Sequence, residues 1–78
     1  MEEKLNKLLA RIFNIPVESI NSNLSMENVP TWDSLAHVNL IYELEETFGV
    51  TFQPHEAINL INYASIQELL KKKTPALN

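Results

Sequence analysis

The chain has 78 residues, enough for one domain and too short for two, so a single domain over residues 1–78 is expected. It contains no cysteine, which excludes disulfides and thiolate metal sites as supports for the core. A net charge of −4 disfavours binding to nucleic acid and favours basic protein partners. No apolar run approaches the about 20 residues of a membrane span, and the first residues are acidic where an export signal is basic. We therefore expect a cytoplasmic protein without membrane insertion.

Residues 2–13 are predicted to form the first helix. Their apolar members recur at i, i+3, i+4 and i+7, which places on one face Leu5, Leu8, Leu9 and Ile12. Asn14 and Pro16 are expected to end this helix.

Residues 14–32 form a long connection rich in Asn, Ser and Pro. It also holds regularly spaced apolar residues: Ile15, Val17, Ile20, Leu24, Met26, Val29 and Trp32. A connection of this length is unusual in a small domain, and its apolar residues indicate that it lies across the core. A short helical turn is expected around Val17 to Ile20.

A second helix is predicted from Ser34 to Phe48, with Asp33 as its N-cap and Gly49 in the left-handed position after its end. Its expected core face consists of Val38, Leu40, Ile41, Leu44 and Phe48. Its expected outer face consists of Leu35, Ala36, Asn39, Tyr42, Glu43 and Glu46. Carboxylates beside large apolar residues suit a docking surface, but scattered surface residues explain the outer face equally well.

The rest of the chain predicts two further helices. Residues 50–52 are too isolated to build a sheet, and residues 54–61 read as a short helix with Pro54 in its first turn. The last helix is predicted to start at Ser65, where Ser65 and Glu68 match a capping box. Lysines 71–73 fit a helix C-terminus better than a binding patch. The expected fold is an all-α four-helix bundle, with three longer helices, one short helix and a long loop between the first two.

Nothing in the sequence supports an enzyme. Ser34 lies outside any G-x-S-x-G motif, and Asp-Ser at a helix start is most often a cap. His37 faces the core side and is interpreted as a partly buried structural histidine, whereas His55 is expected to be solvated. Neither histidine has metal-ligand spacing, so we expect no catalytic residue and no metal site.

The segment around Ser34 nevertheless resembles the acyl carrier protein family. That family is marked by D-S-L at the start of its second helix and E-E-x-F at its end, here Asp33-Ser34-Leu35 and Glu45, Glu46 and Phe48. The resemblance covers nearly the whole chain, because helix order, long loop and chain length also agree.

This resemblance implies a carrier whose Ser34 bears a covalent 4′-phosphopantetheine. A phosphopantetheinyl transferase of the holo-carrier-synthase type would attach that arm, using coenzyme A and Mg²⁺. The arm would hold acyl groups as thioesters for acyl-loading and acyl-transfer enzymes of fatty-acid, polyketide or other specialised biosynthesis. The resemblance further implies a monomer and assigns transferase and partner recognition to Asp33, Leu35, Asn39, Tyr42, Glu43 and Glu46.

Several positions depart from the housekeeping fatty-acid pattern. Ala36 and Asn39 stand where acidic residues are typical, Tyr42 replaces a smaller or more flexible apolar residue, and Trp32 replaces a small one. These departures favour a specialised freestanding carrier. Two alternatives stay open: an aminoacyl or peptidyl carrier, although no glycine precedes Ser34, and a helical adaptor that is never modified.

Overall fold

The computed structural model describes residues 2–74, and this part of the chain is helical throughout its regular structure. Its elements are α1 (Glu2–Phe13), the 3₁₀ turn η1 (Val17–Ser19), α2 (Ser34–Phe48), α3 (Pro54–Ile58) and α4 (Tyr63–Lys73). Within residues 2–74 the only β pairing is one isolated antiparallel bridge, between Ser25 and Asn62. The predicted all-α fold with a long loop after the first helix is confirmed.

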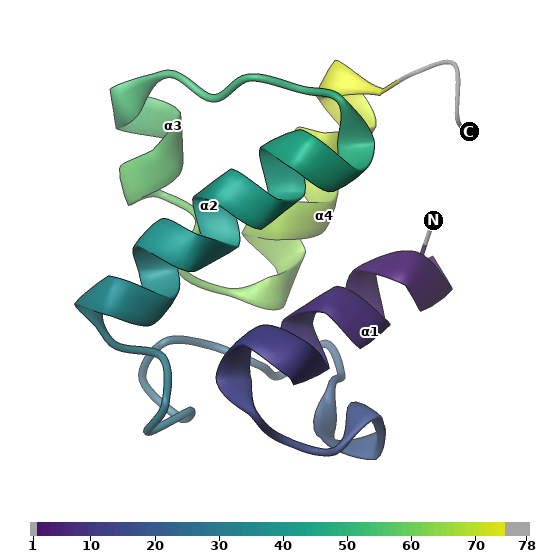
Figure 1. The fold of residues 1–78 in the computed structure, drawn as a ribbon, viewed down its shortest axis with the longest axis vertical. Coiled ribbons are helices and arrows are strands. Elements are labelled where there is room, and N and C mark those ends of the chain that lie inside the picture. Colours follow the sequence, from purple (N-terminus) through teal and green to yellow (C-terminus); the bar gives the residue numbers. More distant parts are fainter. Residues whose placement is uncertain (1, 75–78) are drawn as a thin grey trace.

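The two ribbons of α1 and α2 run in opposite directions along one side of the bundle, and α4 lies behind α2 (Figure 1). The short α3 lies on the side away from both chain ends. The fully buried side chains come from three of the helices and from the segment after α3: Leu5, Leu9, Phe13, Leu40, Leu44, Leu60, Ile66 and Leu70. Burying each such side chain is worth about 1.5–3 kcal/mol, so this shared core is what holds the helices together.

The helix α1 has the predicted bounds, and its core face is nearly as expected. Leu5, Leu8 and Leu9 are buried, but the fourth core position is Phe13, while Ile12 is half-buried. Asn14 ends the helix in the left-handed conformation, at φ 56°. This conformation lets the N–H of Ile15 donate to the carbonyl of Ala10, a bond of 3.1 Å that satisfies one of the last free carbonyls.

The loop of residues 14–32 packs across the core as predicted, and the expected helical turn is present as η1. Four of its apolar side chains are buried: Ile20, Leu24, Val29 and Trp32. Two backbone bonds of 2.9 Å fasten it to the start of α4 and the segment before it: Met26 N–H donates to the carbonyl of Ile61, and Tyr63 N–H donates to the carbonyl of Leu24. The loop is therefore an ordered layer that covers one end of the bundle.

The helix α2 begins and ends where the sequence predicts. Asp33 Oδ1 accepts from the N–H of Ala36 at 2.8 Å, which is the expected N-cap bond. Gly49 has φ 65°, the left-handed conformation that favours glycine, and ends the helix.

Two assignments to the faces of α2 are wrong. Val38 was expected in the core but is 64% exposed, and Ala36 was expected outside but is buried. At about 100° per residue, Val38 lies about 60° from the exposed Leu35, whereas Ala36 lies about 40° from the buried Leu40. Both side chains are apolar, so residue type does not distinguish them. Their angular position around the helix decides which one faces the core.

The last two helices differ from the prediction at their ends. The helix α3 stops at Ile58 instead of residue 61, because Leu60 is buried and the carbonyl of Ile61 bonds to the loop. The helix α4 begins two residues before Ser65, so the predicted Ser65–Glu68 capping box is wrong. Asn62 is the N-cap instead: its Oδ1 accepts from Ser65 N–H at 2.8 Å, and Ser65 Oγ accepts from Asn62 N–H at 3.3 Å.

Candidate functional site

Ser34 is the first residue of α2, and its side chain is exposed. Its hydroxyl makes no hydrogen bond to any other residue in the part of the chain that the structure describes. Leu35 beside it is 72% exposed, while Asp33 before it is exposed but fixed by its cap bond to Ala36. The structure therefore presents an exposed serine hydroxyl at a capped helix start.

The electrostatics of this helix end suit an anion. The first-turn N–H groups of a helix have no partner within the helix, and the helix dipole adds a partial positive charge. Asp33 uses one of these groups, that of Ala36, while those of Ser34 and Leu35 have no hydrogen-bond partner among residues 2–74. A phosphodiester on Ser34 Oγ would therefore find donors within its reach.

The outer face of α2 next to Ser34 is more apolar than predicted. Leu35, Val38 and Tyr42 are 72%, 64% and 62% exposed and follow one another at i, i+3 and i+7. Asn39 and Glu46, also predicted here, are exposed on the same side. We call these five residues the outer strip. Val38 was missed as a member, although its spacing from Leu35 and Tyr42 could have found it.

Glu43 lies at the edge of this strip and points toward α1. Its Oε1 accepts from Arg11 Nη2 at 3.2 Å, and its side chain is 30% exposed. Glu43 therefore contributes to the contact between α1 and α2, whereas Glu46 is exposed.

Two more exposed apolar side chains lie near α3. Ile58 is 71% exposed at its last residue, and Ile61 is 47% exposed after it. Sequence reasoning placed both in a helix without assigning a surface role. The apolar pattern gave no signal of this exposure, because the predicted helix extended to residue 61 whereas the helix in the structure ends at Ile58.

The two histidines behave as predicted. His37 is half-buried and bonded on both sides: Nδ1 accepts from Trp32 Nε1 at 3.1 Å, and Nε2 is 2.9 Å from the carbonyl of Ala57. His55 is exposed near the start of α3. Both bonds engage His37 in the fold, so it is unavailable to activate Ser34.

Ser34 does not line either of two shallow hollows among residues 2–74. One, of about 330 Å³, lies between α3 and α4, and the other, of about 360 Å³, lies in the loop of residues 14–32. Within residues 2–74 no three His, Asp or Glu side chains gather as a metal site would require. No helix in that range is long and apolar enough to cross a membrane.

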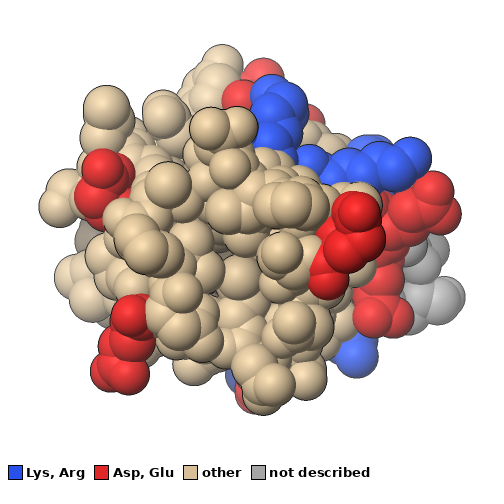
Figure 2. Space-filling model, turned by 90° about the horizontal axis from the view of Figure 1, so that it is seen from below, with Lys and Arg blue, Asp and Glu red and all other residues tan. Residues whose placement is uncertain are grey.

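The surface that the loop covers carries little charge. Viewed from that end, most of the molecule is neither acidic nor basic, and Lys and Arg gather toward one edge (Figure 2). The loop itself contributes only two charged side chains, Glu18 and Glu27. This face offers no basic patch for a phosphate backbone.

A small helical bundle with an exposed, unbonded serine hydroxyl at a helix start fits the class of carrier proteins. No family model matches the chain. It is 37% identical over 60 residues to an acyl carrier protein of Buchnera aphidicola subsp. Schizaphis graminum, which covers 77% of this chain and 76% of that protein. It is 34% identical over 73 residues, 92% of each chain, to an acyl carrier protein of Buchnera aphidicola subsp. Baizongia pistaciae. The chain therefore belongs to the acyl carrier protein family, whose members carry acyl groups and are not enzymes.

Proposed function

We propose that Ser34 Oγ is the attachment point of a 4′-phosphopantetheine arm, and that this chain presents acyl groups to partner enzymes on that arm. The observation that carries the proposal is the exposed, unbonded hydroxyl of Ser34 at the first residue of α2, within Asp33-Ser34-Leu35. When bound, the arm supplies a terminal thiol on which an acyl group is held as a thioester.

The residues around Ser34 fit such a group. The free N–H groups of the first turn of α2 favour a phosphodiester, and the cap bond of Asp33 keeps that turn in place. The exposed Leu35 offers an apolar contact directly beside the attachment point. The Asp33 carboxylate uses Oδ1 in the cap, and its charge remains available to a basic group or the Mg²⁺ of a phosphopantetheinyl transferase.

The outer strip is the surface that the transferase and the acyl-loading and acyl-transfer enzymes contact in this proposal. Its apolar members, Leu35, Val38 and Tyr42, supply contact area, and Glu46 supplies charge for steering. Because the strip has one carboxylate and three large apolar groups, its partners recognise shape more than charge. This supports a specialised carrier over the housekeeping fatty-acid type.

Intact mass tests the proposal directly. The protein is incubated with coenzyme A, Mg²⁺ and a broad-specificity phosphopantetheinyl transferase, alongside Ser34→Ala and the matched control Ser22→Ala, which removes an exposed loop hydroxyl. We expect one phosphopantetheine on the unaltered protein and on Ser22→Ala, and none on Ser34→Ala. If several transferases leave the folded protein unmodified, the unmodified adaptor becomes the better interpretation.

A further inference from the structure

The side chains of Trp32 and His37 meet across the start of α2. Trp32 Nε1 donates to His37 Nδ1 at 3.1 Å, and the ring planes are 21° apart. Trp32 lies two residues before Ser34, and His37 lies three residues after it. The hydrogen bond therefore closes a ring of backbone around residues 33–36. We call this pair the Trp32–His37 clasp.

The two partners of His37 define its tautomer. An indole N–H can only donate, so Nδ1 must be the acceptor and carries no hydrogen. The ring hydrogen of the neutral imidazole is then on Nε2, which donates to the carbonyl of Ala57 at 2.9 Å. A single neutral tautomer satisfies both bonds and joins the loop, α2 and α3 through one side chain.

Trp32 is held from its other side as well. Its side chain is 3% exposed, and its ring stacks on Phe13 at the end of α1 with centroids 4.5 Å apart. The neighbouring Thr31 hydroxyl donates to the carbonyl of Phe13 at 2.6 Å. A continuous series of contacts therefore runs from α1 through Trp32 and His37 to α3. The link matters for α3, because that helix buries none of its own side chains.

Protonation of His37 is incompatible with the clasp. The imidazolium carries hydrogens on both nitrogens, so Nδ1–H would face the indole N–H, and two donors cannot bond to each other. The indole donor, on a buried side chain, would lose its partner, which is unfavourable. The Nε2–H can still donate to Ala57. The clasp therefore opens between Trp32 and His37, while the contact between α2 and α3 remains.

The charged groups on the surrounding elements are occupied elsewhere or exposed. Asp33 caps α2, Glu45 accepts from the N–H of Phe52 at 2.8 Å, and Glu56 on α3 pairs with Lys73. Arg11 on α1 is paired with Glu43, and the other charged groups of α3 and the loop, His55 on α3 and Glu18 and Glu27 in the loop, are exposed. None of them is hydrogen-bonded to the imidazole of His37, so no carboxylate compensates for the bond to Trp32 that protonation breaks.

We propose that the Trp32–His37 clasp is a pH-sensitive positioning device for the start of α2, closed while His37 is neutral and opened when its imidazole takes up a proton. The device rests on geometry: the indole N–H needs an acceptor at Nδ1, and Nδ1 accepts only in the neutral imidazole. A closed clasp would fix the position of Ser34 better for modification, and this consequence rests on the proposed function. The existence of the clasp does not depend on that function.

Intrinsic fluorescence reads the clasp directly, because Trp32 is the only tryptophan in the chain. Emission is followed as the pH falls through the histidine range for the unaltered protein, His37→Gln and the matched control His55→Gln. The side-chain amide introduced by His37→Gln can accept from the indole and donate to Ala57 without titrating. We expect a pH-dependent change in emission for the unaltered protein and His55→Gln, and its loss in His37→Gln. A change that persists in His37→Gln, or is absent from the unaltered protein, would overturn the proposal.

A measurement on the unaltered protein keeps the test independent of any variant's folding. Nitrogen-15 NMR of the imidazole distinguishes the two neutral tautomers. We expect His37 as the Nε2–H tautomer at neutral pH, with the Trp32 indole N–H resonance moving as His37 takes up its proton. An Nδ1–H tautomer, or an indole resonance indifferent to that titration, would contradict the clasp.

The effect on Ser34 has its own readout. The rate of phosphopantetheine transfer to the unaltered protein is divided by the rate to His37→Gln at each pH, which cancels the pH dependence of the transferase. We expect this ratio to fall as His37 is protonated, and a constant ratio would remove the positioning role. Failure of all variants to be modified would instead refute the proposed function, while the fluorescence and NMR results would still decide the clasp.

Discussion

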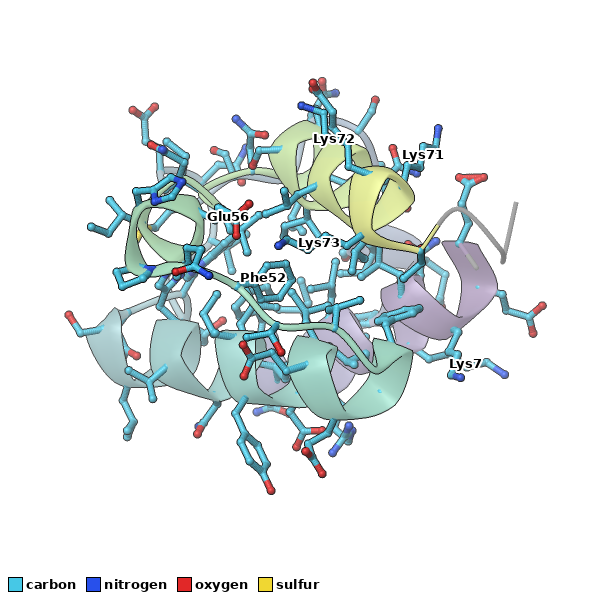
Figure 3. All side chains as sticks on the ribbon, turned by 90° about the horizontal axis from the view of Figure 1, so that it is seen from above. Lys7, Phe52, Glu56, Lys71, Lys72 and Lys73 are labelled. Carbon is cyan, nitrogen blue, oxygen red and sulfur yellow. The ribbon has the colours of Figure 1, made fainter. Side chains whose placement is uncertain are left out.

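The Nζ of Lys73 lies 2.9 Å from Oε1 of Glu56, so the last turn of α4 is joined to α3 by an ion pair. Figure 3 shows Lys73 turned inward toward Glu56 and Phe52, whereas Lys71 and Lys72 point away from them. The ammonium of Lys73 also lies 5.7 Å from the ring centroid of Phe52. The three lysines at the end of α4 are therefore not equivalent, and one of them positions α3.

This ion pair predicts a loss of stability in acid. The Gln53 N–H bond and then the Lys73 ammonium hold the pKa of Glu56 below its ordinary value of 4.5. A carboxyl with a depressed pKa stabilises the fold above pH 4.5, and that contribution is lost as the pH falls through its folded pKa. We expect Glu56→Gln to lower the free energy of unfolding near neutral pH, with the difference disappearing in acid.

Urea unfolding near neutral pH and again in acid, below the folded pKa of Glu56, checks the prediction. Lys73→Gln should be less stable than the unaltered protein near neutral pH, whereas the exposed Lys72→Gln should match it. Equal losses in the two lysine variants would mean that the charge of α4, and not its pair with Glu56, matters.

The N-cap of α2 gives the second prediction. Asp33→Ala removes the 2.8 Å bond to the N–H of Ala36 and should cost about 1 kcal/mol of unfolding free energy. Asp33→Asn keeps an acceptor oxygen in place and should leave stability nearly unchanged. Thermal unfolding of the two variants separates the capping role from the charge.

The same pair of variants then addresses recognition. Because Asp33→Asn retains the cap, a slower phosphopantetheine transfer to this variant would assign the carboxylate charge to the transferase contact. Transfer at the unaltered rate would leave Asp33 with a structural role alone.

The sequence predicts the bounds of α1 and α2 well, because residues at or next to the helix ends determine them. Asp33 and Gly49 bracket α2, and Asn14 ends α1, so neither boundary depends on distant residues. The start of α4 could not be assigned in this way, because Asn62 and Ser65 both have capping side chains. Packing decides between them, through the buried Tyr63 that must lie within the helix.

The candidate site likewise combines features that local sequence predicts with features that depend on tertiary packing. Ser34 and its exposed neighbours Leu35 and Tyr42 follow from motif and periodicity. Glu43 has the same periodicity, but its contact with Arg11 depends on how α1 crosses α2, which no local pattern encodes. The bond between His37 and Ala57 likewise requires the position of α3, set by tertiary contacts.

Tyr63 supplies the third prediction. Its hydroxyl donates to Asn6 Oδ1 at 2.6 Å, linking α4 to α1, so Tyr63→Phe should cost about 1 kcal/mol near neutral pH. Burial raises the pKa of Tyr63 above its ordinary 10.0, and the Glu2 carboxylate adds to this. The unfolded chain therefore ionises first, and the stabilising contribution of Tyr63 is present below pH 10.0 and lost above it.

Unfolding measured at neutral and at alkaline pH follows that loss. The gap between the unaltered protein and Tyr63→Phe should narrow above pH 10.0. Tyr42→Phe, which alters an exposed tyrosine, is the control and should change stability little at neutral pH. A constant gap for Tyr63→Phe would contradict the raised pKa.

The outer strip gives a fourth prediction, through the valine that periodicity assigned to the core. Val38→Ser should change the free energy of unfolding by less than about 0.5 kcal/mol, because the side chain is 64% exposed. It should nevertheless raise the KM of phosphopantetheine transfer, because a serine removes apolar contact area next to Ser34. Val17→Ser is matched in chemistry and is also exposed, but it lies outside α2 and should leave KM unchanged. Equal KM values for both variants would remove Val38 from the partner surface.

The two carboxylates Glu43 and Glu46 give the fifth prediction, because they have the same chemistry and different surroundings. Glu43 is paired with Arg11, so Glu43→Gln should lower the free energy of unfolding by up to about 1 kcal/mol, and Arg11→Gln should lower it by a similar amount. The loss in the double variant should be smaller than the sum of the two single losses, because both remove the same pair. Glu46 is exposed and free of such a pair within residues 2–74, so Glu46→Gln should leave stability unchanged.

Partner binding should show the reverse order. Since an exposed charge steers association, Glu46→Gln should slow the association of a basic partner enzyme more than Glu43→Gln does, and added salt should reduce the difference. Stopped-flow association rates at low and high salt measure this. If Glu43→Gln has the larger effect on association, the Arg11 pair must open on binding, and Glu43 regains the partner role that the sequence predicts for it.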